Sequence, residues 1–303
     1  MVTFSVKGCA GFKMDNSEPK NIGFDMKDAI SDLYRKYGHG DSAHAFNSLL
    51  IWSKDMKISA YVRPGLYSAK LYDAGPNTWF FPVGSNEQKK AFIEDRLQEK
   101  GLVLRYMTPE DLDFVKESFP DTFEIEPAVS DSEYICDRNT IENLPGKGLS
   151  RKKRYVKQLV KEHTFRIKNL DKDTIPDVNY ILDIWRRNKG FDPGCKDRNA
   201  LEAMFENMDA LGIFGIVLYM DEVPCSVMGG YLLSDDTVDC CVQKSVINEY
   251  GLQYYVRQCF SATVPELVRY YNFEEDLGIE GLRQAKEFMH PCKMIDMYIG
   301  IQK

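Results

Sequence analysis

The predicted order of helices and strands constrains the fold of this 303-residue chain most, because the same order occurs twice. In the first half, residues 24–38 and 42–53 carry apolar side chains at helical spacing and predict two helices. Three short predicted strands follow, at 57–62, 66–72 and 78–83. A predicted helix over 86–101 and a strand over 102–107 complete the first set.

The second half repeats this order. Two helices are predicted over 173–190 and 196–212. Three predicted strands follow, at 213–220, 226–233 and 237–246. A helix over about 252–263 and a strand over 268–273 end the second set. The residues themselves are not repeated between the halves, so the interpretation depends on the order of elements alone.

The GCN5-related N-acyltransferase (GNAT) fold has this order of elements: two helices, an antiparallel meander, a helix and a strand. Its occurrence twice predicts a mixed α/β (α+β) chain of tandem GNAT-like acyltransferase domains. In each domain we expect a mostly antiparallel sheet flanked by helices. The first domain, with an N-terminal extension, is expected over 1–130 and the second over 131–303.

Composition excludes some classes of protein. Hydrophobic residues make up 44% of the chain and charged residues 28%, as in ordinary globular proteins. No apolar run reaches the roughly 18 residues that span a bilayer, and the first twenty residues lack a signal-peptide core. We therefore expect a cytoplasmic protein. The net charge of −7 means that an anionic partner must be held by a local basic patch.

Cysteine and histidine positions give no sign of a metal site. The eight cysteines are scattered without a C-x-x-C pair, and the four histidines form no cluster. We expect reduced thiols and no bound metal, while a single catalytic cysteine is the minor alternative.

A basic segment separates the two halves, over 144–167. It contains seven basic residues and no acid between its first and last lysine. These residues are Lys147, Arg151, Lys152, Lys153, Arg154, Lys157 and Lys161. Ser150 is the predicted N-cap of a helix whose apolar face carries Val156 and Leu159. The segment indicates either a phosphate-binding site, for RNA or for an anionic lipid surface, or a solvated helix face.

A coenzyme A-binding loop is expected after the last meander strand in a CoA-dependent member of this fold. Residues 242–255 offer Gly251 there, but Gln253 replaces the second small residue. Conventional acetyl-CoA binding is therefore the weaker interpretation. Gln243 and Lys244 end the strand, where we expect them to face the segment 274–286, although a lysine at a strand end is often simply solvated.

The segment "EEDLGIEGLRQAK" (274–286) places acids and bases at a strand-to-helix junction. Gly278 and Gly281 are predicted to let the backbone turn and approach a ligand closely. Arg283 and Lys286 are three residues apart on the helix, so both side chains leave it on one side. They are candidates for holding a phosphate or for stabilising the oxyanion of an acyl transfer.

The acids of the same segment have two interpretations. Glu275 or Asp276 is a candidate to bind an aminoacyl ammonium, to orient the attacking group or to act as general base. The alternative is an internal knot of ion pairs that fixes the strand to the helix without any chemistry.

The chain resembles a known family in several segments. They are 46–53, 79–84, 119–127, 134–154 and, most distinctively, "EEDLGIEGLRQAKEFMHP" at 274–291. From about residue 24 onward it is similar to the soluble bacterial proteins related to the C-terminal domain of phosphatidylglycerol lysyltransferase. The resemblance implies a tandem GNAT-like fold related to the Fem aminoacyltransferases. It also implies transfer of an aminoacyl group from charged tRNA to a lipid head group.

Two departures from the family pattern stand out. The basic segment reads "LSRKKRYVKQ", where the family suggests a histidine and an asparagine around the basic core. The strand ends in Gln243-Lys244, where the family often has Glu-Lys. If that glutamate acts as a base in relatives, the base is missing here.

Three functions follow as hypotheses. The first is aminoacyl transfer from aminoacyl-tRNA to a lipid head group or another small hydroxyl or amine acceptor, with an anionic membrane reached only peripherally. Its site combines Lys244, Glu275, Asp276, Arg283 and Lys286. The second is an N-acyltransferase that uses a coenzyme A thioester. The third is a non-catalytic module that binds nucleic acid or an anionic surface.

Overall fold

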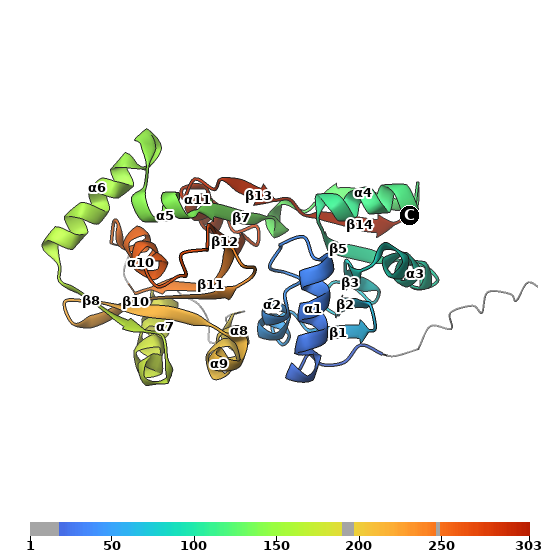
Figure 1. Ribbon diagram of the computed structural model, residues 1–303, viewed down its shortest axis with the longest axis horizontal. Helices are drawn as coiled ribbons and strands as arrows, with labels where there is room; N and C mark the ends of the chain where they lie inside the picture. The colour runs from blue at the N-terminus through green and yellow to red at the C-terminus, as the bar shows by residue number, and fades with distance from the viewer. Residues whose placement is uncertain (1–17, 190–196, 247–248) are drawn as a thin grey trace, which may run out of the picture.

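The computed structural model describes residues 18–189, 197–246 and 249–303, which form two lobes side by side (Figure 1). Each lobe contains one seven-stranded sheet. The sheet of the blue-to-green lobe is named the N-terminal sheet below, and the other is named the C-terminal sheet.

The N-terminal sheet has the strand order β1-β2-β3-β5-β14-β6, with β4 paired to β2. Its strands are β1 (Ile58–Arg63), β2 (Leu66–Leu71), β3 (Thr78–Phe80), β4 (Val83–Gly84), β5 (Val103–Met107), β6 (Phe123–Pro127) and β14 (Tyr298–Gln302). Its helices are α1 (Lys27–Tyr37), α2 (Phe46–Trp52), α3 (Asn86–Arg96) and α4 (Pro109–Ser118). All strand pairs are antiparallel except β3 with β5.

The C-terminal sheet has the order β13-β7-β12-β11-β10-β9-β8. Its strands are β7 (Glu133–Asp137), β8 (Phe165–Asn169), β9 (Phe214–Met220), β10 (Val223–Leu232), β11 (Thr237–Ser245), β12 (Tyr270–Glu275) and β13 (Lys293–Ile295). Its helices are α5 (Arg138–Asn143), α6 (Gly146–Glu162), α7 (Ile175–Lys189), α8 (Arg198–Glu206), α9 (Met208–Leu211), α10 (Leu252–Ser261) and α11 (Glu280–Glu287). Here the parallel pair is β11 with β12.

The two sheets share one plan. Each has an antiparallel meander, β1-β2-β3 or β9-β10-β11, whose last strand pairs in parallel with the strand after the next helix, β5 or β12. The meander strands lie where the sequence predicts them. The predicted mixed α/β class with mostly antiparallel sheets is confirmed. The predicted helix over 196–212 is interrupted at Asn207 into α8 and α9.

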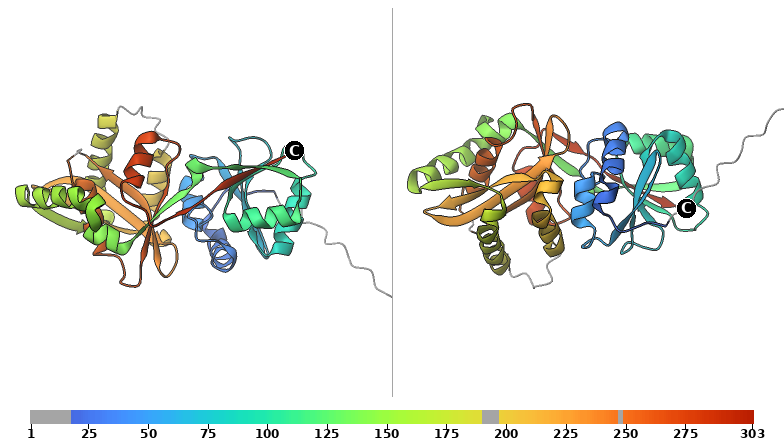
Figure 2. Two further views of the ribbon diagram at one scale, coloured as in Figure 1. Left: turned by 90° about the horizontal axis from the view of Figure 1, so that it is seen from above. Right: turned by 60° about the horizontal axis from the view of Figure 1, so that its bottom comes forward.

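The chain crosses between the two sheets twice. After β6 it enters the C-terminal sheet at β7, and after β13 it returns to the N-terminal sheet at β14. β14 lies between β5 and β6 and pairs with both, while β7 lies between β12 and β13. Figure 2 shows these strands running from one lobe into the other. The division at 130/131 remains a prediction, but residues 298–302 belong to the N-terminal sheet.

Buried side chains form one core that continues through both lobes, from Ile30 on α1 to Phe273 on β12. A second cluster, which includes Trp79 and Phe92, lies within the N-terminal lobe alone. Among the described residues, no helix combines the length and the apolar character needed to cross a bilayer. The six described cysteines are free thiols. Cys9 and Cys195 lie outside the described residues, and so does Gly190, the last residue of the predicted helix over 173–190.

The position of β14 leads to a test of the N-terminal sheet. Removing residues 298–303 leaves β5 and β6 without the strand that joins them. We expect the free energy of unfolding to fall by more than about 3 kcal/mol, which exceeds the effect of most single substitutions. Urea unfolding followed by Trp fluorescence measures it. Removing the exposed Lys303 alone is the control, and an equal loss in both variants would contradict the prediction.

Candidate functional site

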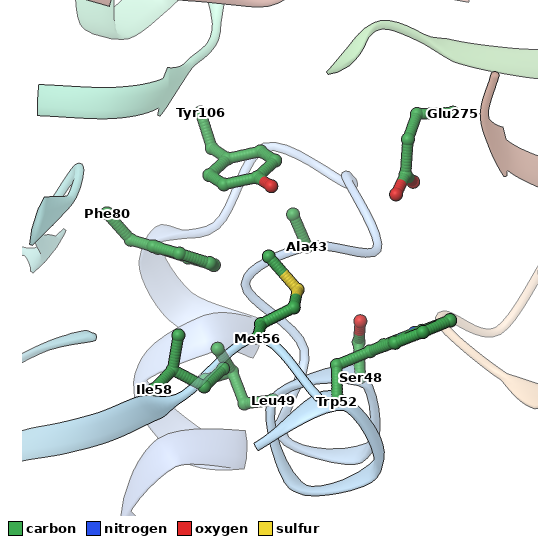
Figure 3. A pocket seen from close by; sticks show the side chains of 9 residues that line it. All are labelled: Ala43, Ser48, Leu49, Trp52, Met56, Ile58, Phe80, Tyr106 and Glu275. Atoms are coloured by element: carbon green, nitrogen blue, oxygen red, sulfur yellow. The ribbon is translucent and has the colours of Figure 1, made fainter. Parts of the chain in front are cut away.

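A pocket lies between the lobes, where β5 and β12 end (Figure 3). It encloses about 330 Å³ of unoccupied space, solvent at its mouth included. The lining residues are Ala43, Ser48, Leu49, Trp52, Met56, Ile58, Phe80, Tyr106 and Glu275. Figure 3 shows the Tyr106 hydroxyl and the Glu275 carboxylate pointing into the same space above an apolar floor. One phenol from the N-terminal lobe and one carboxylate from the C-terminal lobe therefore line the same pocket.

The two strands that end at the pocket share an unusual backbone. Tyr106 on β5 has φ +56° and Glu274 on β12 has φ +57°, both in the left-handed region that side chains other than glycine disfavour. The pairing register of both strands is interrupted at these places. Such a conformation costs about 1–3 kcal/mol and is concentrated at functional sites in proteins. These irregularities turn Tyr106 and Glu275 toward the pocket.

Glu275 belongs to a cluster of carboxyl groups at the boundary between the lobes. The cluster, named the carboxyl cluster here, consists of Glu133, Asp239, Glu274 and Glu275. Glu133 and Asp239 are fully buried, and both carboxyl oxygens of Asp239 lack a hydrogen-bond partner among the described residues. Burial raises the pKa of all four groups, and repulsion from neighbouring carboxylates adds to the rise. This is an environment that favours a cation.

Glu133 also connects the two lobes. Its carboxylate accepts hydrogen bonds from the backbone N–H of Ser42 (2.9 Å) and of Ala43 (3.3 Å), and from the Ser42 hydroxyl (2.8 Å). On the other side it accepts from the Asn272 amide at 2.5 Å. Burial, followed by repulsion from Asp41, raises the pKa of Glu133 to about 7, although the hydrogen bonds from Asn272 and Ser42 oppose the rise.

Lys286 is a buried cation beside the carboxyl cluster. It is 8% exposed, and its Nζ donates to the carbonyl of Phe273 at 2.5 Å and to the carbonyl of Glu275. Burial lowers the pKa of Lys286, while the Glu274 and Glu275 carboxylates act in the opposite direction. The ammonium therefore holds the end of β12 that carries Glu275.

Asp276 and Arg283 bind each other. Arg283 Nε lies 2.8 Å from Asp276 Oδ2, and Nη2 lies 3.1 Å from Oδ1. The Tyr134 hydroxyl and the Gly278 N–H donate to the same carboxylate, at 2.6 Å and 2.8 Å. These hydrogen bonds lower the pKa of Asp276 despite its burial. The arrangement corresponds to the knot that fixes strand to helix, and a catalytic role for either residue remains an untested prediction.

Gln243 and Lys244 lie elsewhere on the C-terminal sheet. Lys244 Nζ is 2.8 Å from Asp197 Oδ2 and 3.9 Å from the centre of the Trp185 ring. Gln243 accepts a hydrogen bond from Arg257 Nε. None of these partners lines the interlobe pocket, and a role of Gln243 and Lys244 in the site remains an untested prediction.

The three glycines of the predicted site differ. Gly278 has φ +71° and makes the turn after Asp276, as expected. Gly281 is an ordinary residue of α11, and a Cβ there would meet no atom within 4 Å, so no close approach requires it. Gly251 has φ +100°. A Cβ added at this position would lie 2.8 Å from the Tyr155 carbonyl carbon, because α6 packs directly on the glycine.

The basic residues lie on α6, which Figures 1 and 2 show at the end of the molecule remote from the N-terminal lobe. The helix begins at Gly146 after Pro145, so Ser150 is not its N-cap; the Ser150 hydroxyl donates to the Lys147 carbonyl inside the first turns. Within the described chain, none of the seven basic residues forms an ion pair. Six are exposed, and Lys152 is half-buried over the Phe288 ring.

The sequence interpretation missed Tyr106, Glu133 and Asp239. Asp239 had a usable signal, since it is a lone acid within the apolar strand "TVDCCV", and buried acids are rare. Glu133 and Tyr106 had none, because their contacts depend on how the lobes meet.

Known proteins resemble this chain in sequence and in fold. The sequence model of one family, described as "Phosphatidylglycerol lysyltransferase, C-terminal", matches residues 34–300. No curated protein matches the chain.

Solved structures resemble the whole chain. A conserved protein of unknown function from Bacteroides thetaiotaomicron has a TM-score of 0.85 at 22% identity, over 94% of this chain and 99% of its own. The structure of L-PGS from Bacillus licheniformis has a TM-score of 0.62 at 12% identity, over 95% and 94%. FemX has a TM-score of 0.58 at 10% identity, over 90% and 95%. The predicted fold is confirmed, and it is shared with L-PGS and with FemX over nine-tenths or more of this chain.

The glycines provide a matched pair of substitutions. Gly251→Ala combines an unfavourable φ with a contact against the α6 backbone, so we expect it to destabilise the protein. Gly281→Ala adds a methyl group in open space on a helix, and we expect it to raise the free energy of unfolding by up to about 1 kcal/mol. Urea unfolding of both variants gives the result; destabilisation by Gly281→Ala would show that this position is constrained.

The carboxyl cluster predicts a pH dependence of stability. The native pKa of Glu133, about 7, lies above its ordinary value of 4.5, so the native state binds more protons between these values. Stability is therefore lost as pH rises from 4.5 to 7. Glu133→Gln removes one titrating proton. We therefore expect the slope of stability against pH to become shallower by up to about 1.4 kcal/mol per pH unit. Urea unfolding at pH 5, 6, 7 and 8 measures it, and identical slopes in both proteins would refute this assignment.

Proposed function

Because the chain belongs to the family of phosphatidylglycerol lysyltransferase C-terminal domains, we propose that it transfers an aminoacyl group from aminoacyl-tRNA. The acceptor is a hydroxyl or amine, with a lipid head group as the first candidate. The observation that carries the proposal is the interlobe pocket, in which Glu275 faces Tyr106 between apolar walls.

In the proposed reaction, the acceptor oxygen or nitrogen attacks the carbonyl carbon of the aminoacyl ester. Glu275 takes the proton of the acceptor as a new bond to the carbonyl carbon forms. The bond to the terminal ribose oxygen of the tRNA breaks, and this oxygen leaves with the electron pair and receives the proton that Glu275 took, which restores the Glu275 carboxylate. Burial raises the pKa of Glu275, which makes its carboxylate a stronger base than an ordinary glutamate.

Tyr106 is the proposed partner of the reacting ester. Burial, with repulsion from Glu275, raises the pKa of its hydroxyl, so the phenol stays protonated and able to donate. A hydroxyl held in an apolar pocket is suited to stabilise the developing oxyanion.

The rest of the carboxyl cluster suits the ammonium group of an aminoacyl donor. Glu133, Asp239 and Glu274 lie around the same strand end, and the Asp239 carboxyl has no hydrogen-bond partner among the described residues. An ammonium group would supply the missing opposite charge. Lys286 and the Asp276–Arg283 pair act as positioning residues in this scheme, since they hold the backbone on both sides of Glu275.

The exposed basic face of α6 is the proposed contact for tRNA phosphates. Coenzyme A fits this chain less well, because α6 packs against the N-terminus of α10 at Gly251, where its pyrophosphate would bind. Use of aminoacyl-tRNA places the reaction in the cytoplasm, and contact with an anionic membrane would be peripheral.

A transfer assay tests the proposal. The protein is incubated with a pool of tRNA carrying radioactive amino acids and with phosphatidylglycerol vesicles, and label is followed from tRNA into lipid. We expect Glu275→Gln to lower the rate at least about a hundredfold while tRNA binding persists. Transfer at the original rate in this variant would exclude Glu275 as base, and loss of label to water alone would exclude the lipid acceptor.

Binding of tRNA is tested separately, by titration at increasing salt. Reversing Lys153 and Lys157 to glutamate is expected to weaken binding and to reduce the salt slope by about two. Reversing Lys90 and Lys100, which are exposed on and after α3, is the matched control. Equal effects of the two double reversals would show that α6 is an ordinary solvated helix.

A further inference from the structure

Two tyrosine rings are stacked on the C-terminal lobe, where α6 meets the start of α10. The ring of Tyr155 on α6 and that of Tyr250, just before α10, have centroids 5.2 Å apart and planes inclined by 31°. This spacing lies in the range of offset stacking between aromatic rings. Gly251 keeps the two rings together, because its backbone lies directly against that of Tyr155. The pair is named the tyrosine platform here.

The outer ring of the platform is exposed. Tyr250 has 76% of its surface accessible to solvent, whereas Tyr155 is half-buried. Among the described residues with large apolar or aromatic side chains, only Leu267 is exposed to the same degree. Tyr250 therefore offers a flat apolar surface whose position is fixed by the ring and the glycine beside it.

Positive charges flank the platform. The guanidinium of Arg151 lies 5.4 Å from the centre of the Tyr155 ring, and its Nε donates to the Tyr155 hydroxyl at 2.5 Å. The guanidinium of Arg154 lies 5.9 Å from the same ring. Both arginines are exposed, and within the described chain neither forms an ion pair. Glu249, the acid next to Tyr250 in the sequence, leaves positive charge in excess.

Cations beside an exposed aromatic ring are the combination that holds unpaired nucleotides. Arginine and lysine contact the phosphates, and every nucleobase has a flat face that stacks on a tyrosine ring. An anionic membrane suits this surface less well, because a helix that lies on a bilayer needs an apolar face turned outward. Val160 is the one bulky apolar side chain among the exposed positions of α6.

We propose that the tyrosine platform stacks an unpaired base of the RNA whose phosphates α6 contacts. Tyr250 covers one face of the base, Tyr155 supports Tyr250, and the two arginines contact the adjoining phosphates. The inference rests on the proposed use of tRNA, and it adds that the RNA presents a single-stranded segment at this surface. None of the platform residues lines the interlobe pocket, so the platform binds RNA without taking part in the transfer step.

Fluorescence of 2-aminopurine tests stacking on the full chain. This adenine analogue is quenched when it stacks on an aromatic ring, and a short single-stranded RNA that contains it is titrated with the protein. We expect saturable quenching, and no change when the same strand is first paired in a duplex. Tyr250→Leu is expected to abolish the quenching and to weaken binding at least about fivefold. Its salt slope is expected to stay unchanged, because no phosphate contact is lost.

Two variants serve as controls. Tyr250→Phe keeps the ring and is expected to quench like the original protein. Tyr72→Leu removes an exposed tyrosine of the N-terminal lobe, and we expect it to have no effect. Absence of quenching in the original protein, or quenching that persists in Tyr250→Leu, would overturn the proposal.

Phosphatidylglycerol vesicles are the second probe. If Tyr250→Leu weakened binding to these vesicles but not to the RNA, the platform would be a lipid contact and the proposal would fail. The transfer assay separates this inference from the proposed function. Quenching without transfer would support the platform and reject aminoacyl transfer, whereas transfer without quenching would reject the platform alone.

Discussion

The two crossings of the chain between the sheets are the constraint on which the rest of the structure depends. β7 and β14 each lie inside a sheet whose other strands come mostly from the other half of the sequence. The lobes are therefore joined by strand pairing as well as by side-chain contacts. This fixes the distance between β5 and β12, and with it the position of Tyr106 opposite Glu275. A site assembled from two lobes requires such rigidity, because small displacements of reacting groups reduce rates strongly.

The same junction explains how the carboxyl cluster is tolerated. Glu133 receives hydrogen bonds from Ser42 and Ala43 of one lobe and from Asn272 of the other. Lys286 balances part of the remaining charge while it holds the end of β12. Asp239 accepts no hydrogen bond from the described residues within ordinary geometry, while the nearby Tyr231 hydroxyl and the charge of Lys286 oppose the rise in its pKa. The cost of burying these acids is met by the large shared core around them.

Local patterns in the sequence were sufficient for the repeated order of elements, because meander strands and amphipathic helices depend on nearby residues. They also located the segment 274–286 and its ion pair. They were insufficient where a contact joins distant elements. Lys244 binds Asp197, which lies on another element, and Glu133 binds a loop 90 residues earlier in the chain. Neither contact could therefore be predicted from nearby residues. Ser150 failed as a cap because Gly146 allows the helix to begin one turn earlier.

The place of β14 has a consequence for synthesis of the protein on the ribosome. The N-terminal sheet needs residues 298–302 between β5 and β6, so it stays incomplete until the strands of the C-terminal sheet, which precede β14 in the chain, have been translated. Domains usually fold in order as they emerge, but this one must wait with two unpaired strand edges exposed. Contacts between residues so far apart also make folding slow. Nascent chains of this protein are accordingly expected to depend on chaperones more than their modest length suggests.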